Sequence, residues 1–152
     1  MPEKATLGRA RRDKRQGKAP TTQAGEFIRE EMHHIRHGKH GARSTKQAIA
    51  IGLSKARRAG VKLRAPKKGK ASAATRHKAQ RDYAKGQKHA NRKPSRTRSR
   101  AISRALRREG HSAASHRALS RQARSAARRR SHRQRSAAAR KAAHTRELAV
   151  AA

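Results

Sequence analysis

The chain of 152 residues contains no cysteine and no tryptophan, and Phe27 and Tyr83 are its only aromatic residues. Without cysteine it forms no disulfide and offers no thiolate as a nucleophile or metal ligand. With so few aromatics it lacks the platforms on which proteins stack the bases of single-stranded or looped RNA. The absence of a long apolar run and of a signal-peptide core argues against membrane insertion. We therefore expect no membrane partner.

Acidic residues are also scarce. There are 8 Asp and Glu against 44 Lys and Arg, and the net charge is +36. Eight scattered acids, with no Ser/His/acid trio and no glycine-rich phosphate loop, predict a protein that is not an enzyme and carries no cofactor. A charge of this size attracts polyanions, and duplex DNA is the densest common one, so double-stranded DNA is the expected partner. RNA or a ribosome is the alternative.

Large apolar side chains are few, because alanine supplies most of the 32% of residues that are hydrophobic. Low hydrophobicity combined with high net charge is typical of disordered chains. The charge is lowest in residues 1–41, at +5, and reaches +18 in residues 88–152. These patterns predict three parts: a basic N-terminal arm (1–20), a helical hairpin (21–65) and an Arg/Ala/Ser-rich basic tail (66–152).

The best helical pattern runs from about Thr22 to His37. An apolar stripe at helical spacing is formed by Ala24, Phe27, Ile28, Met32 and Ile35. Acidic residues lie toward its N-terminal half and histidines toward its C-terminal half, which suits the helix dipole. Gly38 is the expected stop.

A second helix is expected to begin at Ser44, because Ser44 and Gln47 have the spacing of a capping box. Gly60 followed by Val61 predicts a Schellman ending with a hydrophobic contact. The fold class expected is therefore mostly α: a small hairpin over about 22–60, basic arms that are disordered or helical only when bound, and no β-sheet. Within the tail, the segments able to form helices are 72–85, 99–109 and 112–148, the first two ending at Gly86 and Gly110.

Arginine and lysine clusters are the expected nucleic-acid contacts, because the planar guanidinium binds phosphate oxygens without reading bases. No zinc finger, minor-groove hook or well-packed helix-turn-helix is evident, so the binding is expected to ignore DNA sequence. The predicted contact residues are Arg43, Lys46, Lys55, Arg57, Arg58, Lys67, Lys68, Arg107, Arg108, Arg124, Arg128, Arg129, Arg130, Arg133, Arg135 and Arg140.

Histidines gather at the end of the first helix. His33 and His37 stand four residues apart on one face, with Glu30 one turn earlier, and this spacing can chelate zinc or nickel. The preferred interpretation is a helix end whose positive charge grows as the pH falls. We therefore predict no metal site, with His33 and His37 as the candidate ligands if one exists.

The segment STKQAIAIGLSKARRAG (44–60), with GEFIREE (25–31) before it and VKL (61–63) after it, resembles a family of small Lys/Arg-rich bacterial proteins. Members of that family carry DNA-binding or plasmid-stabilisation labels. The resemblance implies a bacterial protein of the cytoplasm or nucleoid, but it supplies no binding residues to carry over. The tail is similar in composition to those of histone-like proteins.

Together these observations predict a nucleoid-associated, histone-like protein that compacts DNA through phosphate contacts. An RNA- or ribosome-associated basic protein would use the same arms. A protein-interaction module is a third hypothesis, in which the 22–60 helices dock a partner through the stripe of Phe27, Ile28, Met32 and Ile35.

Overall fold

The structure, a computed structural model, describes residues 2–88 and 95–150, and the backbone alone of 145 and 148–150. Over these residues it is mostly α-helical and contains no β-strand, as the sequence predicted. The elements, in chain order, are α1 (Lys4–Arg15), α2 (Pro20–Arg36), α3 (Thr45–Arg58), α4 (Ala73–Gln87), α5 (Arg96–Arg107), the short 3-10 helix η1 (Ser112–Ala114), α6 (His116–Arg128) and α7 (His132–Val150).

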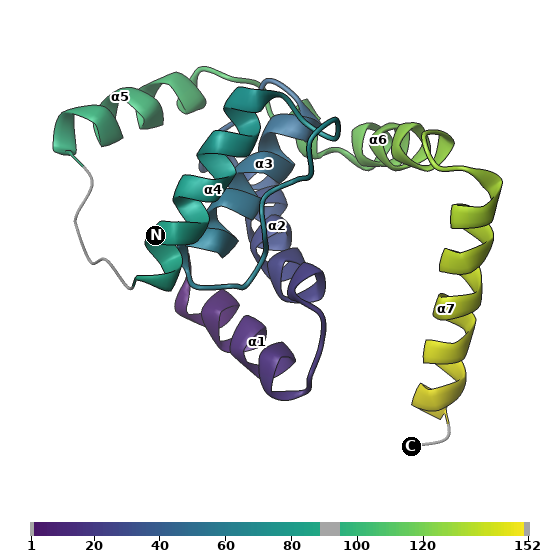
Figure 1. The fold of residues 1–152 in the computed structure, drawn as a ribbon. Helices are drawn as coiled ribbons and strands as arrows, with labels where there is room; N and C mark the ends of the chain where they lie inside the picture. Colours follow the sequence, from purple (N-terminus) through teal and green to yellow (C-terminus); the bar gives the residue numbers. More distant parts are fainter. Residues whose placement is uncertain (1, 89–94, 151–152) are drawn as a thin grey trace. The chain divides into compact units, whose positions relative to one another are not determined.

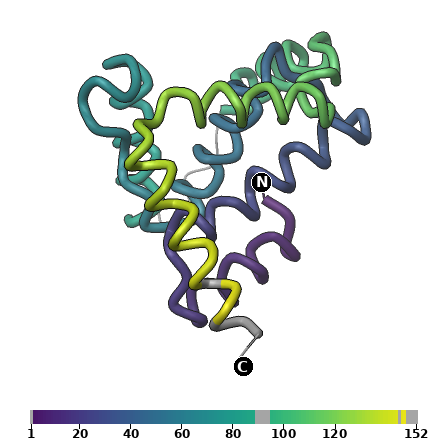
Figure 2. Tube along the Cα trace, turned by 90° about the vertical axis from the view of Figure 1, so that its right-hand side faces the viewer, coloured from purple at the N-terminus to yellow at the C-terminus, as the bar shows by residue number. Residues whose placement is uncertain are grey.

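The chain divides into two compact units, Met1–Ser115 and His116–Ala152, which are described separately. In the first unit α2 packs against α3, α1 packs against α2, and α4 packs against α3 (Figure 1). Figure 2 shows the trace of the chain from a second side, beginning with α1 in purple. The first unit is thus larger than the hairpin of 21–65 expected from the sequence.

Helix α2 matches the first predicted helix and begins two residues earlier, at Pro20. Proline suits the first helical position because its missing N–H has no intrahelical partner there. At the other end Gly38 has a φ of 71°, Gly38 N donates to Ile35 O and Lys39 N donates to His34 O. This pair of bonds is the Schellman motif, so Gly38 ends the helix as predicted.

Helix α3 carries both of its predicted end signals. The Ser44 hydroxyl accepts a hydrogen bond from Gln47 N at 3.2 Å, and the Gln47 side chain accepts one from Arg43 N at 2.8 Å. The side chain of Gln47 therefore reaches one residue further back than in the usual capping box. At the C-terminus Gly60 N donates to Arg57 O and Val61 N donates to Ala56 O, which confirms the Schellman ending.

A small core joins α1, α2 and α3. It consists of Ala10, Ala24, Phe27, Ala56 and Val61, with Leu7, Leu53 and Leu63 packed against it. Most of the predicted α2 stripe is buried, including Phe27 and Ile35 at 0% exposure, whereas Ile28 is half-buried. Ile28 lies where the backbones of α2 and α3 are close together, because a Cβ on Gly52 would stand only 2.8 Å from the Ile28 Cα.

Residues 1–20 are not a separate arm, because α1 is packed against α2 and buries Thr6, Ala10 and Asp13. These residues recur at helical spacing, but they are small or polar, so a search for large apolar side chains overlooks the face that they form. Helix α4 is similar. Its buried residues are Ala79 and Gly86, and small residues bring helix backbones close together without a large hydrophobic stripe.

Gly86 does not end the fourth helix, which continues to Gln87. It lies against the C-terminal turn of α3, where a Cβ at Gly86 would stand 1.9 Å from Arg57 O and 3.1 Å from Gly60 N. Neither neighbour is a flexible side-chain end, so only a glycine fits without moving backbone.

Gly86→Ala is therefore expected to lower the free energy of unfolding by about 1–3 kcal/mol, because the added methyl separates α3 from α4. The matched control is Gly8→Ala in α1, where a Cβ would meet nothing within 4 Å. That change should raise stability by about 0.5–1 kcal/mol through reduced backbone entropy. Urea unfolding followed by circular dichroism measures both. Equal effects of the two substitutions would contradict the close contact.

The end of α5 and the segment after it are anchored to the end of α2, the start of α3 and the loop between them. Gly41 N donates to Leu106 O at 2.9 Å and Ala42 N donates to Gly110 O at 3.0 Å. The Thr45 hydroxyl donates to Ala113 O at 2.7 Å, and Arg36 Nε donates to Ala114 O at 2.8 Å. These bonds attach residues 106–114 to α2, α3 and the loop between them within the first unit, although α5 buries no residue.

The second unit holds α6 and α7. Alanine and arginine have high helix propensities, which favours helices here even though the sequence predicted arms that are disordered or helical only when bound. Helix α7 begins with a complete capping box: Gln134 N donates to Ser131 Oγ at 3.3 Å, and Ser131 N donates to Gln134 Oε1 at 3.2 Å. No residue of α6 is buried.

Candidate nucleic-acid interface

Helix α6 presents a row of arginines along one face. Arg117, Arg121, Arg124 and Arg128 follow one another at intervals of four, three and four residues, and all four are exposed. A shallow hollow on this face is lined by Arg121, Arg124, Ser125, Arg128 and Arg129. In the whole sequence no acidic residue lies between Glu109 and Glu147. The α6 row therefore offers several guanidinium groups with no carboxylate near them in the chain.

Most of the contact residues predicted from the sequence are exposed. In the first unit they lie just before α3, on it, on the segment after it and at the end of α5. In the second unit they lie on α6, α7 and the turn between them. The exposed members are Arg43, Lys46, Arg58, Lys67, Lys68, Arg107, Arg108, Arg124, Arg128, Arg129, Arg130, Arg133, Arg135 and Arg140.

Lys55 and Arg57 are used inside the first unit instead. Lys55 Nζ lies 2.5 Å from Glu31 Oε2, and the side chain is 24% exposed. Arg57 is only 7% exposed, and its Nε donates to Leu63 O at 3.1 Å. Burial lowers the pKa of the Arg57 guanidinium, and Asp82 opposes that shift. Both residues hold α3 in place, which removes them from the set available to phosphates.

Two of the exposed arginines have carboxylate neighbours. Arg43 Nε lies 3.5 Å from Glu109 Oε1, and Arg58 Nε lies 3.8 Å from Asp82 Oδ1. The Arg43 and Arg58 side chains are 82% and 53% exposed, so these pairs are solvated and weak. These carboxylates therefore hold the two guanidinium groups only weakly.

Helix α5 carries a second row of arginines, of which only Arg107 was among the contacts predicted from the sequence. Arg96, Arg100, Arg104 and Arg107 recur at intervals of four, four and three residues, and all are exposed. The helical spacing of these arginines is visible in the sequence. The sequence-based prediction relied instead on adjacent pairs such as Arg107 and Arg108.

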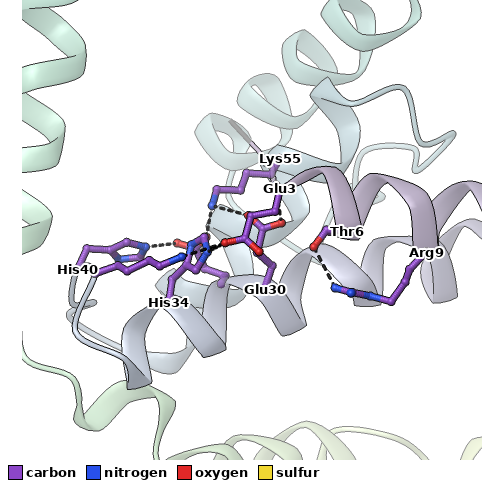
Figure 3. Close-up of polar contacts among 9 residues, drawn as sticks. Glu3, Thr6, Arg9, Glu30, His34, His40 and Lys55 are labelled. Carbon is purple, nitrogen blue, oxygen red and sulfur yellow. Dashed lines mark hydrogen bonds and ion pairs between the residues drawn. The ribbon is translucent and has the colours of Figure 1, made fainter.

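A cluster of ionic side chains lies between α1, α2 and α3 (Figure 3). Glu30 and Glu31 on α2 are 3% and 0% exposed. Besides its contact with Glu31, Lys55 Nζ lies 3.6 Å from Glu30 Oε1, and Glu3 N donates to Glu30 Oε2 at 3.2 Å. The cluster therefore joins the start of α1 to α2 and to the last turn of α3.

Two histidines extend this cluster toward the loop after α2. His34 Nε2 lies 2.7 Å from Glu3 Oε1, and His40 Nε2 lies 3.2 Å from Glu31 Oε1. Lys39 Nζ donates to Glu3 Oε1 at 2.9 Å. The hydrogen bond from His34 and, to a smaller extent, the one from Lys39 lower the pKa of the Glu3 carboxyl from 4.5 to about 2. The spacing of residues in the sequence did not predict that Glu31, His34 and His40 meet, because His40 lies outside α2.

His33 and His37, the candidate metal ligands from the sequence, are exposed on α2 and on the residue after it, and their ring centroids are 4.0 Å apart. The charge of His37 lowers the pKa of His33. Glu30, the third member of that candidate set, is instead engaged with Lys55 and the backbone of Glu3.

Residues 15–69, about a third of the chain, match the model of a family described as "Family of unknown function (DUF6496)". This similarity covers α2, α3 and the loop between them, and it ends before α4. No curated protein and no solved structure matches the chain. Among the described residues, no helix has the length and apolar character needed to cross a membrane.

Proposed function

We propose that this protein binds double-stranded DNA without sequence preference and compacts it, as a histone-like protein of the bacterial nucleoid. The observation that carries the proposal is the second unit, where residues 116–152 hold eleven Lys and Arg against one acid. Charges of one sign at this density repel each other, and phosphates that replace their counterions relieve the repulsion. The similarity to DNA-binding and plasmid-stabilisation proteins noted for residues 44–60 agrees with this role.

The α6 row suggests how the contact is made. From Arg117 to Arg128 the helix rises about 16 Å, a length along which a duplex carries about ten phosphate charges. Four arginines neutralise fewer than half of these, so the row alone leaves most of these charges unneutralised. Guanidinium forks on phosphate oxygens fix position without reading bases.

Duplex DNA is favoured over RNA because the chain has no aromatic platform to offer. Phe27 is fully buried in the core and Tyr83 is half-buried. Proteins that bind single-stranded or looped RNA stack bases on several exposed aromatic side chains. An RNA- or ribosome-associated role remains the alternative, because bare cationic helices also bind structured RNA.

The third hypothesis, a protein-interaction module, is less favoured, because most of the stripe that it relies on is buried and only Ile28 is half-buried. Phe27 and Ile35 are 0% exposed and Met32 is 7% exposed, all within the first unit. A partner cannot dock on these side chains while that unit stays folded.

Gel-shift titration on two duplexes of equal length and unrelated sequence tests the proposal. The two affinities are expected to agree within about threefold, because phosphate contacts carry no sequence information. Ribosomal RNA added at equal phosphate concentration serves as the competitor. A strong preference for one duplex, or complete displacement of the protein from DNA by the RNA, would move the assignment to a specific regulator or to the RNA alternative.

A further inference from the structure

Three side chains with metal-binding atoms converge at the C-terminal end of α2. One potential ligand atom from each of Glu31, His34 and His40 lies within 4.8 Å of the other two. Two of the three, Glu31 and His34, are buried, and the His40 side chain is 17% exposed. The rings of His34 and His40 meet edge to face, with centroids 6.1 Å apart, so they do not stack on one another.

The spacing suits a tetrahedral ion. Bonds of about 2.0–2.1 Å to histidine nitrogen and carboxylate oxygen place neighbouring ligand atoms about 3.3 Å apart. His40 Nε2 and Glu31 Oε1 are already 3.2 Å apart. The remaining separations are within 4.8 Å, so small side-chain rotations are sufficient to close the set.

The hydrogen bonding of His40 points the same way. Its Nδ1 lies 3.1 Å from Gly41 O, and a carbonyl only accepts, so Nδ1 carries the proton. In the neutral ring Nε2 then has a lone pair directed at the Glu31 carboxylate, and two acceptors face each other at 3.2 Å. A proton or a metal ion on Nε2 resolves that contact. A backbone carbonyl on the opposite nitrogen is the usual support of a histidine ligand.

The carboxylate side of the cluster has capacity for a cation. Both oxygens of Glu31 and Oε1 of Glu30 are buried and accept no hydrogen bond, although Lys55 and His40 lie at ion-pair distance. Three of the eight acidic residues, Glu3, Glu30 and Glu31, belong to this cluster in a chain of net charge +36. Lys39 and Lys55 offset two of these three charges, so the cluster keeps one negative charge when its histidines are neutral.

We infer that Glu31, His34 and His40 form a binding site for a divalent transition-metal ion, with Zn²⁺ as the expected ion. Two histidines and one carboxylate are an established zinc ligand set. Lys55 stays on the second oxygen of Glu31, and Glu3, 2.7 Å from His34 Nε2, is the positioning carboxylate for that ring. The ion ties the loop that contains His40 to α2, so it stabilises the first unit independently of nucleic-acid binding.

Metal titration of the full chain, prepared without an affinity tag and freed of nucleic acid, tests the site. Zn²⁺ is measured by competition with a chromophoric chelator, and Co²⁺ serves as an optical probe of tetrahedral geometry. We expect one equivalent of Zn²⁺ to bind and the thermal midpoint of the first unit to rise, because an ion that binds only the folded state stabilises it.

Two double variants separate the two histidine pairs. His34→Ala/His40→Ala is expected to weaken Zn²⁺ binding at least about 100-fold, since it removes two ligands. His33→Ala/His37→Ala, the matched control, removes as many histidines from the same region and should leave the affinity unchanged within about threefold. Circular dichroism of each variant in chelator establishes whether it is folded. The single variant His40→Gln, altered only in the loop, gives a further test if the double variant unfolds.

Failure of the wild-type chain to bind Zn²⁺ stoichiometrically overturns the inference. So does a loss of affinity in His33→Ala/His37→Ala equal to that in His34→Ala/His40→Ala, because the site would then not be the buried one. X-ray absorption of the Zn²⁺ complex provides a check that needs no variant, and a first shell without two imidazoles also contradicts the assignment.

Discussion

Binding of the full chain to a DNA duplex is expected to weaken by about 10³–10⁵-fold between about 50 and 200 mM salt. That loss corresponds to about six to ten phosphate contacts, each of which releases condensed counterions. The chain has the charge for it, because residues 42–152 carry 34 Lys and Arg against three acids. Fluorescence anisotropy at a series of salt concentrations gives the slope of log affinity against log salt. Affinity that is independent of salt would rule out the phosphate mechanism.

The α6 row should account for a defined part of that slope. Replacing Arg117, Arg121, Arg124 and Arg128 with Gln keeps helix propensity and removes four charges. The slope is then expected to become shallower by about 0.9 for each phosphate that the variant no longer neutralises, so by about 3–4 in total.

The matched control removes four charges from α1, where Arg11, Arg12, Lys14 and Arg15 are exposed. Residues 1–41 contain five of the eight acids, so the field around α1 is weaker and its substitution should change the slope less. If both variants shift the slope equally, net charge alone sets the binding and the α6 row is not a preferred contact.

Lys55→Met is expected to lower the free energy of unfolding by about 3–5 kcal/mol, because it leaves buried carboxylates without their main counter-charge. Glu30 and Glu31 are 3% and 0% exposed, and Lys55 Nζ lies 3.6 and 2.5 Å from their oxygens. Lys46→Met, on the exposed side of the same helix, is the matched control and should change stability by less than about 0.5 kcal/mol.

A double substitution separates ion pairing from packing. Lys55→Met with Glu31→Met replaces a buried pair with apolar side chains, a change that is often neutral in stability. It should therefore recover most of the loss caused by Lys55→Met alone, as measured by urea unfolding. If the double variant is as unstable as the single one, the stem of Lys55 contributes through packing and not through its charge.

The sequence alone determined the helices whose signals are local. The apolar stripe of α2, the Ser44 cap and the glycines at 38 and 60 act within a few residues of where they stand, so their effects can be read along the chain. The excess of arginine and lysine is likewise a property of composition. It needs no fold to favour a polyanionic partner.

Only the tertiary structure decided what depends on distant residues. Helices α1 and α4 pack in the first unit through small residues such as Ala10, Ala79 and Gly86. These residues allow the backbone of a neighbouring helix to come close. Lys55 and Arg57 look like phosphate contacts in sequence, but Glu31 and Leu63 engage them inside the unit. The meeting of Glu31 with His34 and His40 likewise requires the chain to turn after α2. The spacing of residues along α2 cannot predict this contact, because the position of His40 depends on the path of the loop after the helix.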